Sequence, residues 1–215
     1  MNDFSPELEH YILAHISEED PVLFQLNRET HMNVLYSRMC SGHLQGSILT
    51  MLSRMINPRN ILELGTFTGY SAICLAKGLQ KEGKLHTIEV NDELEEMAFS
   101  YFEKANLQNT IVQHIGDASE IIPTLNETFD LVFMDADKRR YKEHYDLVFD
   151  KVPVGGYIFA DNILWSGKVT GEIDPRDTQT TGILEFNESI KKDERVEKVI
   201  LPIRDGMTII RKIKN

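Results

Sequence analysis

The sequence has only two cysteines, Cys40 and Cys74, and their separation does not match a metal-ligand spacing. Two cysteines are also too few for the disulfide framework of a small secreted domain. Cys74 lies among apolar residues at helical spacing, where a thiol usually serves core packing. We therefore expect reduced cysteines and a cytoplasmic protein.

Long apolar runs are absent as well. No stretch approaches the roughly 20 residues that a helix needs to span a bilayer. The first residues, MNDFSPELEH, carry acids where a secretory signal carries basic residues. The sequence thus predicts neither a membrane span nor secretion.

Basic residues are scarce relative to acidic ones. The chain has 23 Lys and Arg against 34 Asp and Glu, a formal net charge of −11. Tight, non-specific nucleic-acid binding depends on basic residues that displace counterions. We therefore expect a small neutral or cationic substrate, although Lys138, Arg139, Arg140 and Lys142 form a local basic cluster.

No linker rich in proline, glycine or serine divides the 215 residues, and we find no internal repeat. We predict a single domain 1–215, with an N-terminal helical cap (1–57) and a core (58–215). In the cap, Ser5-Pro6 is typical of a helix start. Two further cap helices are predicted at 21–39 and 43–55.

From Asn60 the pattern alternates between short apolar strands and helices. This alternation is typical of an α/β protein with a doubly wound, mostly parallel sheet and helices on both faces. The predicted strands are 60–64, 84–89, 110–115, 129–134 and 157–160, and the predicted helices are 70–78, 92–105, 118–123 and 139–150.

The C-terminal part departs from this alternation. We predict a polar loop from Ser166 to Pro175, a helix at 181–191, and strands at 196–202 and 207–211. Asp205-Gly206 lies between these strands and is typical of a hairpin turn. The last two strands should therefore form an antiparallel pair, which gives seven strands in all.

Two of the predicted parallel strands end in oxygen ligands. The run FMDADK contains Asp135, and the run YIFADN ends in Asp161 and Asn162. If the strands are neighbours, about 4.8 Å apart, these side chains meet at one sheet edge, where they suit Mg²⁺ or Ca²⁺. Taken singly, each segment is explained as well or better by a helix cap or a turn.

The run ILELGTFTGYS has the order strand, glycine turn, helix start. Glycine tolerates positive φ and lets backbone approach a ligand. Glu89 ends the next strand, where an acid accepts ribose hydroxyls, and Asp117 follows the third, where an acid can meet an adenine amino group. Glu63 would attract a cofactor with a cationic sulfur and an amino-acid tail. Tight turns alone would explain each glycine, but three such strand ends favour a cofactor site.

These runs together resemble the cation-dependent, S-adenosylmethionine-using O-methyltransferases, the family of caffeoyl-CoA and catechol O-methyltransferases, in its small bacterial form. The resemblance covers nearly the whole chain and rests on MCSGHLQG, ELGTFTGYS, MDADK, DNILWSG and LPIRDGMT. It implies a Rossmann-like, seven-stranded methyltransferase fold, S-adenosyl-L-methionine as cofactor, and Mg²⁺ (or Ca²⁺ or Mn²⁺). It also implies a homodimer.

The resemblance further implies roles for individual residues. Asp135, Asp161 and Asn162 would hold the cation. Lys138 and Asp135 would serve catalysis, with Lys138 as general base, and Trp165 and Lys138 would contact the substrate. The implied cofactor-binding residues are Met39, Glu63, Gly65, Thr66, Tyr70, Ser71, Glu89, Val90, Asp117, Ala118, Asp135 and Asp137.

The predicted reaction is methyl transfer to a hydroxyl of a catechol-like aromatic small molecule, because a cation chelated by two adjacent hydroxyls ionises and orients them. One alternative is a transfer RNA hydroxyuridine O-methyltransferase of the same fold. Another is a non-catalytic cofactor-binding interaction protein. For Lys138 the alternative to a base is a surface lysine at a helix start, and for Trp165 the alternative to a substrate contact is plain packing. His43 and His144 could be pocket residues, but we interpret both as solvated or hydrogen-bonded histidines.

Overall fold

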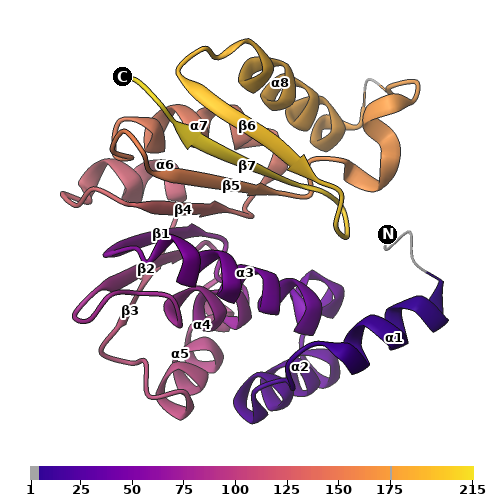
Figure 1. The fold of residues 1–215 in the computed structure, drawn as a ribbon, viewed down its shortest axis with the longest axis vertical. Helices are drawn as coiled ribbons and strands as arrows, with labels where there is room; N and C mark the ends of the chain where they lie inside the picture. The colour runs from indigo at the N-terminus through magenta and orange to yellow at the C-terminus, as the bar shows by residue number, and fades with distance from the viewer. Residues whose placement is uncertain (1–4, 175) are drawn as a thin grey trace.

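A seven-stranded sheet forms the centre of the protein (Figure 1). The computed structural model describes residues 5–174 and 176–215. The strand order is β3-β2-β1-β4-β5-β7-β6, in which β1 to β5 are parallel and β7 runs antiparallel to both β5 and β6. The strands are β1 (Asn60–Leu64), β2 (Lys84–Glu89), β3 (Ile111–Ile115), β4 (Leu131–Met134), β5 (Tyr157–Asp161), β6 (Val196–Leu201) and β7 (Met207–Lys212). The predicted mostly parallel sheet with an antiparallel C-terminal pair is confirmed.

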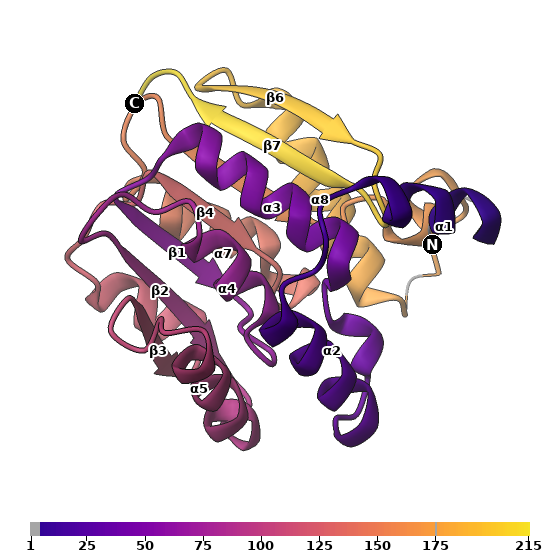
Figure 2. The same cartoon turned by 60° about the horizontal axis from the view of Figure 1, so that its bottom comes forward.

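Helices cover both faces of the sheet (Figure 2). One face carries α2 (Pro21–Asn33), α3 (Gly42–Ile56), α4 (Tyr70–Ala76) and α5 (Glu95–Lys104). The other carries α6 (Ala118–Ile121), α7 (Tyr141–Phe149) and α8 (Thr178–Lys192). The first helix, α1 (Pro6–His15), has no buried residue. Within residues 5–174 and 176–215, no helix has the length and apolar character that crossing a membrane requires.

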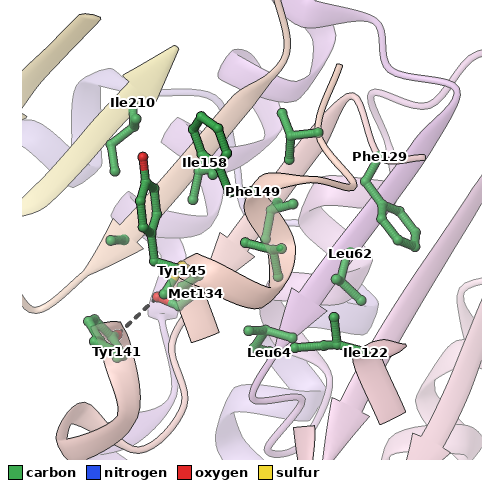
Figure 3. Packing of buried hydrophobic residues seen from close by; sticks show 14 of the residues in the cluster. Leu62, Leu64, Ile122, Phe129, Met134, Tyr141, Tyr145, Phe149, Ile158 and Ile210 are labelled. Atoms are coloured by element: carbon green, nitrogen blue, oxygen red, sulfur yellow. Dashed lines mark hydrogen bonds between the residues drawn. The ribbon is translucent and has the colours of Figure 1, made fainter. Parts of the chain in front are cut away.

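Each face of the sheet has its own hydrophobic core, because successive strand side chains point to opposite sides. Leu62 and Leu64 pack with Tyr145 and Phe149 of α7 on one side (Figure 3). Ile61, from the same strand, packs on the other side with α4 and α5. Because both faces are covered, the strands are apolar on both sides, as is usual in parallel sheets.

The largest departure from the predicted elements lies in the helical cap. The helix predicted at 21–39 ends at Asn33. Val34 is extended, Tyr36 adopts a left-handed conformation (φ 57°), and a 3-10 turn, η1 (Ser37–Met39), follows. Apolar residues at helical spacing continue through Leu35 and Tyr36, but both are exposed, so no core contact holds the helix together here.

The segment after β5 also differs from its prediction. The predicted polar loop begins with a 3-10 segment, η5 (Trp165–Thr170), and its predicted end, Pro175, lies outside the described residues. The next helix starts at Thr178, earlier than predicted, because the Asp177 side chain accepts a hydrogen bond from the Thr180 amide and caps it.

Other boundaries differ by a few residues. The strands β3 and β4 start slightly later than predicted. Three of the predicted helices are divided, since η2 (Asp92–Leu94) precedes α5, η3 (Ile122–Thr124) follows α6, and η4 (Lys138–Arg140) precedes α7.

Candidate functional site

The carboxyl ends of the parallel strands open into one cavity of about 950 Å³, which is within the usual range for small-molecule sites. We call the part formed by residues at or just after the carboxyl ends of β1, β2 and β3 the β1–β3 end. The part formed by residues that lie between β5 and β7 in the sequence is the β5–β7 end. Twelve of the predicted site residues line it: Met39, Gly65, Glu89, Val90, Asp117, Ala118, Asp135, Asp137, Lys138, Asp161, Asn162 and Trp165.

Four predicted cofactor residues do not line the cavity. Glu63, Thr66, Tyr70 and Ser71 are buried behind the glycine turn. The Thr66 hydroxyl bonds the Thr87 hydroxyl at 2.5 Å, and the Tyr70 hydroxyl donates to Glu19 Oε1 at 2.6 Å. In this conformation their side chains hold the turn and α4 against neighbouring elements.

Glu63 is fully buried in the sheet. One carboxyl oxygen accepts a hydrogen bond from the Thr87 hydroxyl at 2.6 Å, and the other has no partner among the described residues. Burial raises the pKa of Glu63 to about 8. The carboxyl is therefore mostly protonated at neutral pH, unlike the charged group from which we argued attraction to a cationic cofactor.

Close contacts within the fold require glycine at both positions of the turn. Gly65 has φ 99°, and a Cβ there would lie 2.5 Å from the backbone oxygen of Asp135. Gly69 has φ 91°, and a Cβ there would lie 2.6 Å from the Phe102 ring. Tight chain approach thus explains both glycines, and only Gly65 also lines the cavity.

Glu89 closes the turn from the neighbouring strand. Its Oε2 accepts from the Phe67 amide at 2.7 Å and its Oε1 accepts from the Asn91 amide at 2.9 Å. Each carboxylate oxygen has a further lone pair. The two backbone bonds therefore fix a charged acceptor on the cavity wall.

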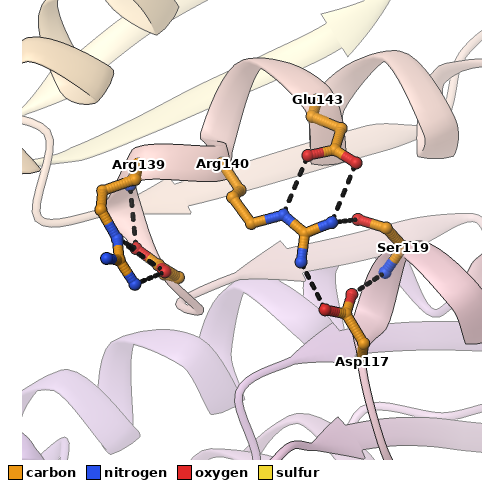
Figure 4. A network of polar contacts seen from close by, with 6 residues as sticks. Asp117, Ser119, Arg139, Arg140 and Glu143 are labelled. Carbon is orange, nitrogen blue, oxygen red and sulfur yellow. Dashed lines mark hydrogen bonds and ion pairs between the residues drawn. The ribbon is translucent and has the colours of Figure 1, made fainter.

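A network around Arg140 fixes the residues after β3 and β4 (Figure 4). The guanidinium donates to Asp117 at 2.5 Å, to Ser119 at 2.6 Å and to Glu143 at 2.9 Å. The Ser119 amide and Arg140 together hold the pKa of Asp117 below its ordinary value. Asp117 therefore stays ionised on the cavity wall.

The three predicted cation ligands line the cavity together, after the adjacent strands β4 and β5. Asp161 is only 3% exposed, and burial together with the nearby Asp135 charge raises its pKa to about 6. In the described part of the chain, no group of three or more His, Cys, Asp or Glu is placed to hold a metal ion. A cation here would rely on two carboxylates, the Asn162 amide and oxygens from other molecules, a donor set that fits Mg²⁺.

Lys138 is only 6% exposed, so the alternative of a surface lysine is wrong. Its Nζ donates to Asp135 Oδ1 and to the Tyr141 hydroxyl, each at 2.6 Å. The Tyr141 hydroxyl also lies 3.0 Å from the backbone oxygens of Met134 and Asp161. This tyrosine therefore fixes the lysine at the junction of the two strand ends.

A hydrogen-bonded chain lies behind Asp161 and was not predicted from the sequence. Gln45 Nε2 donates to Asp161 Oδ2 at 2.5 Å, and Arg204 donates to Gln45 Oε1 and to the Ser41 backbone oxygen. Gln45 and Arg204 belong to MCSGHLQG and LPIRDGMT, so the runs were recognised without these roles. Cavity residues that were also missed include Tyr36, Arg38, Phe67, Lys168 and Gln179.

The two histidines differ from each other. His43 Nε2 lies 2.8 Å from the Ser17 backbone oxygen, which confirms a hydrogen-bonded histidine. The same interpretation of His144 is wrong. Its side chain is buried, lines the cavity, and has no hydrogen-bond partner among the described residues at either ring nitrogen.

Comparisons with known proteins agree with this geometry. A family model described as O-methyltransferase matches residues 14–213. Caffeoyl-CoA O-methyltransferase 2 of Populus trichocarpa is 32% identical over 98% of this chain and 90% of its own length. Caffeoyl-CoA O-methyltransferase 1 of Arabidopsis thaliana is 32% identical over 97% and 85%.

Solved structures share the fold. The O-methyltransferase TomG from Streptomyces achromogenes, solved in complex with SAM, superposes with a TM-score of 0.89, at 30% identity and over 96% of both chains. The O-methyltransferase from Bacillus cereus, solved with SAH, gives a TM-score of 0.89, at 27% identity and over 96% and 97% of the two chains.

Proposed function

Because the chain belongs to this O-methyltransferase family, and is an S-adenosylmethionine-dependent O-methyltransferase with the seven-stranded fold of such enzymes, we propose that its methyl acceptor is a small aromatic molecule with two adjacent hydroxyls. The acceptor would bind at the β5–β7 end through a divalent cation. The cofactor would bind at the β1–β3 end.

One observation carries this proposal: Asp135, Asp161 and Asn162 line the same cavity wall as Lys138 and Trp165. A divalent cation held by the three oxygen ligands would lower the pKa of two chelated hydroxyls and fix their positions. Trp165 offers a flat apolar surface that favours an aromatic ring over a sugar.

On the cofactor side we propose Glu89 for the ribose hydroxyls, Asp117 and Ala118 for the base, and Asp137 for the amino-acid tail. Glu89 and Asp117 are fixed by backbone amides. The Gly65 backbone borders the same space. Met39 and Val90 would add apolar contacts. Binding both substrates in one cavity supplies orientation, which can contribute effective molarities of about 10⁵ M or more.

Lys138 is the proposed general base. Its Nζ is held by Asp135 and Tyr141, so a hydroxyl bound beside Asp135 would lie within its reach. We expect Lys138→Met to lower kcat by about 10²-fold or more, the usual contribution of a general base. Lys142→Met is the matched control, because Lys142 is a half-buried lysine of α7 that pairs with Asp146 and does not line the cavity. Equal rates for both variants would show that the cation alone ionises the acceptor.

The alternative of a transfer RNA substrate is less well supported. Arg139, Arg140 and Lys142 of the basic cluster each pair with a carboxylate, and Lys138 is buried. The cluster is therefore not a free basic surface of the kind that attracts a phosphate backbone.

The test is a comparison of three acceptors under one set of conditions: a catechol, its single-hydroxyl analogue and a transfer RNA that contains hydroxyuridine. With Mg²⁺ present we expect methylation of the catechol, a much lower rate on the monophenol, and loss of activity in excess chelator that Mg²⁺ restores. Equal rates on catechol and monophenol would refute chelation. A far higher rate on the RNA would establish the alternative substrate.

We also propose a homodimer that uses the N-terminal helices and the C-terminal strands. Large apolar side chains are exposed on or beside α2 and α3, at Met32, Leu35 and Met55, and on the edge strand β6, at Val199 and Ile200. Light scattering should report twice the chain mass of 24.7 kDa, and a monomer at micromolar concentration would contradict the proposal. The cytoplasmic location stays a prediction.

A further inference from the structure

Two histidines meet on the sheet outside the cavity. His86 lies on β2, and His114 lies on β3, the edge strand of the sheet (Figure 1). His86 faces the same side of the sheet as Ile88, two residues further on, and Ile88 is the register partner of His114. Both imidazoles therefore lie on the side that α6 and α7 cover, and neither lines the cavity.

The ring nitrogens of this pair are close enough to share one ion. His86 Nδ1 lies 3.1 Å from His114 Nε2, and the stacked rings have centroids 5.3 Å apart. Imidazole nitrogens bind Zn²⁺ at about 2.0–2.1 Å, so two of them on one ion, at an angle of about 90–110°, are roughly 2.9–3.4 Å apart. The observed separation falls in this range. A hydrogen bond between two neutral rings has a similar length, so the surroundings of the pair decide between the two.

The position and charge state of the rings suit a metal ion. His86 is 9% exposed and packs edge-on against Phe129, with centroids 5.8 Å apart, which restrains its ring. His114 is half-buried on the edge strand. Burial lowers the pKa of both imidazoles below its ordinary value. Both rings are therefore neutral at neutral pH, the form that coordinates a metal.

A carboxylate stands beside the pair. Glu127, in the loop between η3 and β4, acts electrostatically on both rings. Its side chain is exposed and makes no hydrogen bond or ion pair with another described residue. Lys84, the cation that acts on His86, has its Nζ held by the Asn109 backbone oxygen at 2.5 Å. A hydrogen bond between neutral rings needs no nearby anion, whereas a cation gains from the charge of Glu127 and from an oxygen ligand.

We propose that His86 and His114 bind one divalent transition metal ion, such as Zn²⁺ or Cu²⁺, with Glu127 as a third ligand. Imidazole suits these metals, whereas Mg²⁺ and Ca²⁺ prefer oxygen ligands, so the site differs in chemistry from the oxygen ligands in the cavity. The bound ion would tie β2 to β3. Because it binds the folded protein, it should raise the melting temperature.

The experiment titrates Zn²⁺ into the full chain, which is first freed of metal with a chelator and then kept in excess Mg²⁺ to fill the oxygen ligands of the cavity. We expect Zn²⁺ to raise the melting temperature of the wild type. In calorimetry the Zn²⁺ dissociation constant should rise at least about tenfold in His114→Gln, since even outer-shell partners of a metal contribute 10- to 100-fold, and should rise less in Glu127→Gln.

The matched control is His31→Gln, because His31 is an exposed histidine of α2 whose Nδ1 lies 2.9 Å from the Asn27 backbone oxygen. It should bind Zn²⁺ as the wild type does. A second comparison, His144→Gln, reports on binding inside the cavity and should also match the wild type.

Cu²⁺ reports the ligands directly. With one equivalent of Cu²⁺, the electron paramagnetic resonance spectrum of the wild type should show coupling to two imidazole nitrogens, and that of His114→Gln should show coupling to one. Lowering the pH from 7 to 5 should weaken binding, because the imidazoles gain protons.

A wild type that does not respond to Zn²⁺, or a His114→Gln variant that binds it equally well, would show that the pair is only a hydrogen bond and would overturn the inference. An equal loss in His144→Gln would place the ion in the cavity and overturn it as well. If His114→Gln does not fold, the wild-type Cu²⁺ spectrum decides, because a spectrum without two nitrogen couplings contradicts the site.

Discussion

At the β1–β3 end of the cavity the side chains follow regular parallel strands, whereas at the β5–β7 end most come from irregular segments. Gly65, Glu89 and Asp117 each lie at or just after the end of a strand. Trp165 and Arg204, by contrast, belong to a 3-10 segment and to the connection between β6 and β7. One end thus inherits its geometry from the sheet, and the other is assembled from separate pieces of chain.

Backbone conformation shows the same contrast. Among the described residues, nine that are not glycine have positive φ. Six of these line the cavity: Tyr36, Phe67, Asn162, Trp165, Ser166 and Arg204. Four of them, Asn162, Trp165, Ser166 and Arg204, belong to the β5–β7 end. Such conformations cost on the order of 1 kcal/mol each and persist only where tertiary contacts hold them. The β5–β7 end therefore depends on the rest of the fold more than the β1–β3 end does.

The largest expected effect tests the steric basis of the β1–β3 end. Gly65→Ala would place a Cβ 2.5 Å from the Asp135 backbone oxygen at φ 99°. We expect a loss of about 3–6 kcal/mol in the free energy of unfolding, from overpacking and backbone strain together, and no detectable binding of S-adenosylhomocysteine. The measurements are urea unfolding and calorimetry.

The matched control for Gly65→Ala is Gly167→Ala at the β5–β7 end. Gly167 also has positive φ (78°), but a Cβ there meets no atom within 4 Å. Only the conformational cost of about 1 kcal/mol is expected. Equal losses in the two variants would show that the close approach to Asp135 is unimportant.

The next effect concerns the buried carboxyl behind the glycine turn. The pKa of Glu63 is raised from 4.5 to about 8 in the folded protein, so the folded state binds more protons than the unfolded state between these values. The stability of the wild type should therefore fall as pH rises from about 4.5 to 8 and level off above that. Glu63→Gln removes this dependence.

The quantity to compare is the free energy of unfolding of Glu63→Gln minus that of the wild type. Between pH 4 and pH 9 we expect this difference to rise by about 3–5 kcal/mol, as the size of the pKa shift implies. The measurement is the free energy of unfolding of both proteins across this range. Parallel curves would mean that Glu63 is ionised in the folded protein at neutral pH.

The smallest effect on stability tests the β5–β7 end. Arg204→Gly relieves a left-handed backbone (φ 48°) but removes the hydrogen bonds to Gln45 and Ser41. These terms offset each other, so we expect the free energy of unfolding to change by less than about 1 kcal/mol. The Mg²⁺ concentration needed for half-maximal activity should rise roughly tenfold, about the value of one charged hydrogen bond, because Gln45 no longer orients Asp161.

Asn57→Gly is the control for Arg204→Gly, since Asn57 has φ 52° outside the cavity. It should leave the Mg²⁺ dependence unchanged. A Mg²⁺ requirement that is equally unchanged in Arg204→Gly would show that the chain from Arg204 to Asp161 does not position the proposed cation ligand.

Most of the β1–β3 end could be predicted because each of its signals is local. An apolar run of five or six residues followed by Gly65, Glu89 or Asp117 is visible in the sequence, and parallel strands bring such ends to one sheet edge. Local signals did not separate the side chains that face the cavity from those behind it. Glu63 and Tyr70 lie beside the turn in sequence, yet the fold buries both away from the cavity.

The strands of the sheet, the polar residues at their ends and the family could all be predicted from the sequence, because hydrophobic periodicity and short motifs act over a few residues. Three findings depend instead on how distant segments pack: Lys138 is buried, His144 is buried without a hydrogen-bond partner among the described residues, and Arg204 reaches Gln45. These outcomes join segments as far apart as 159 positions. Such contacts are set by how whole layers pack, which no local spacing records.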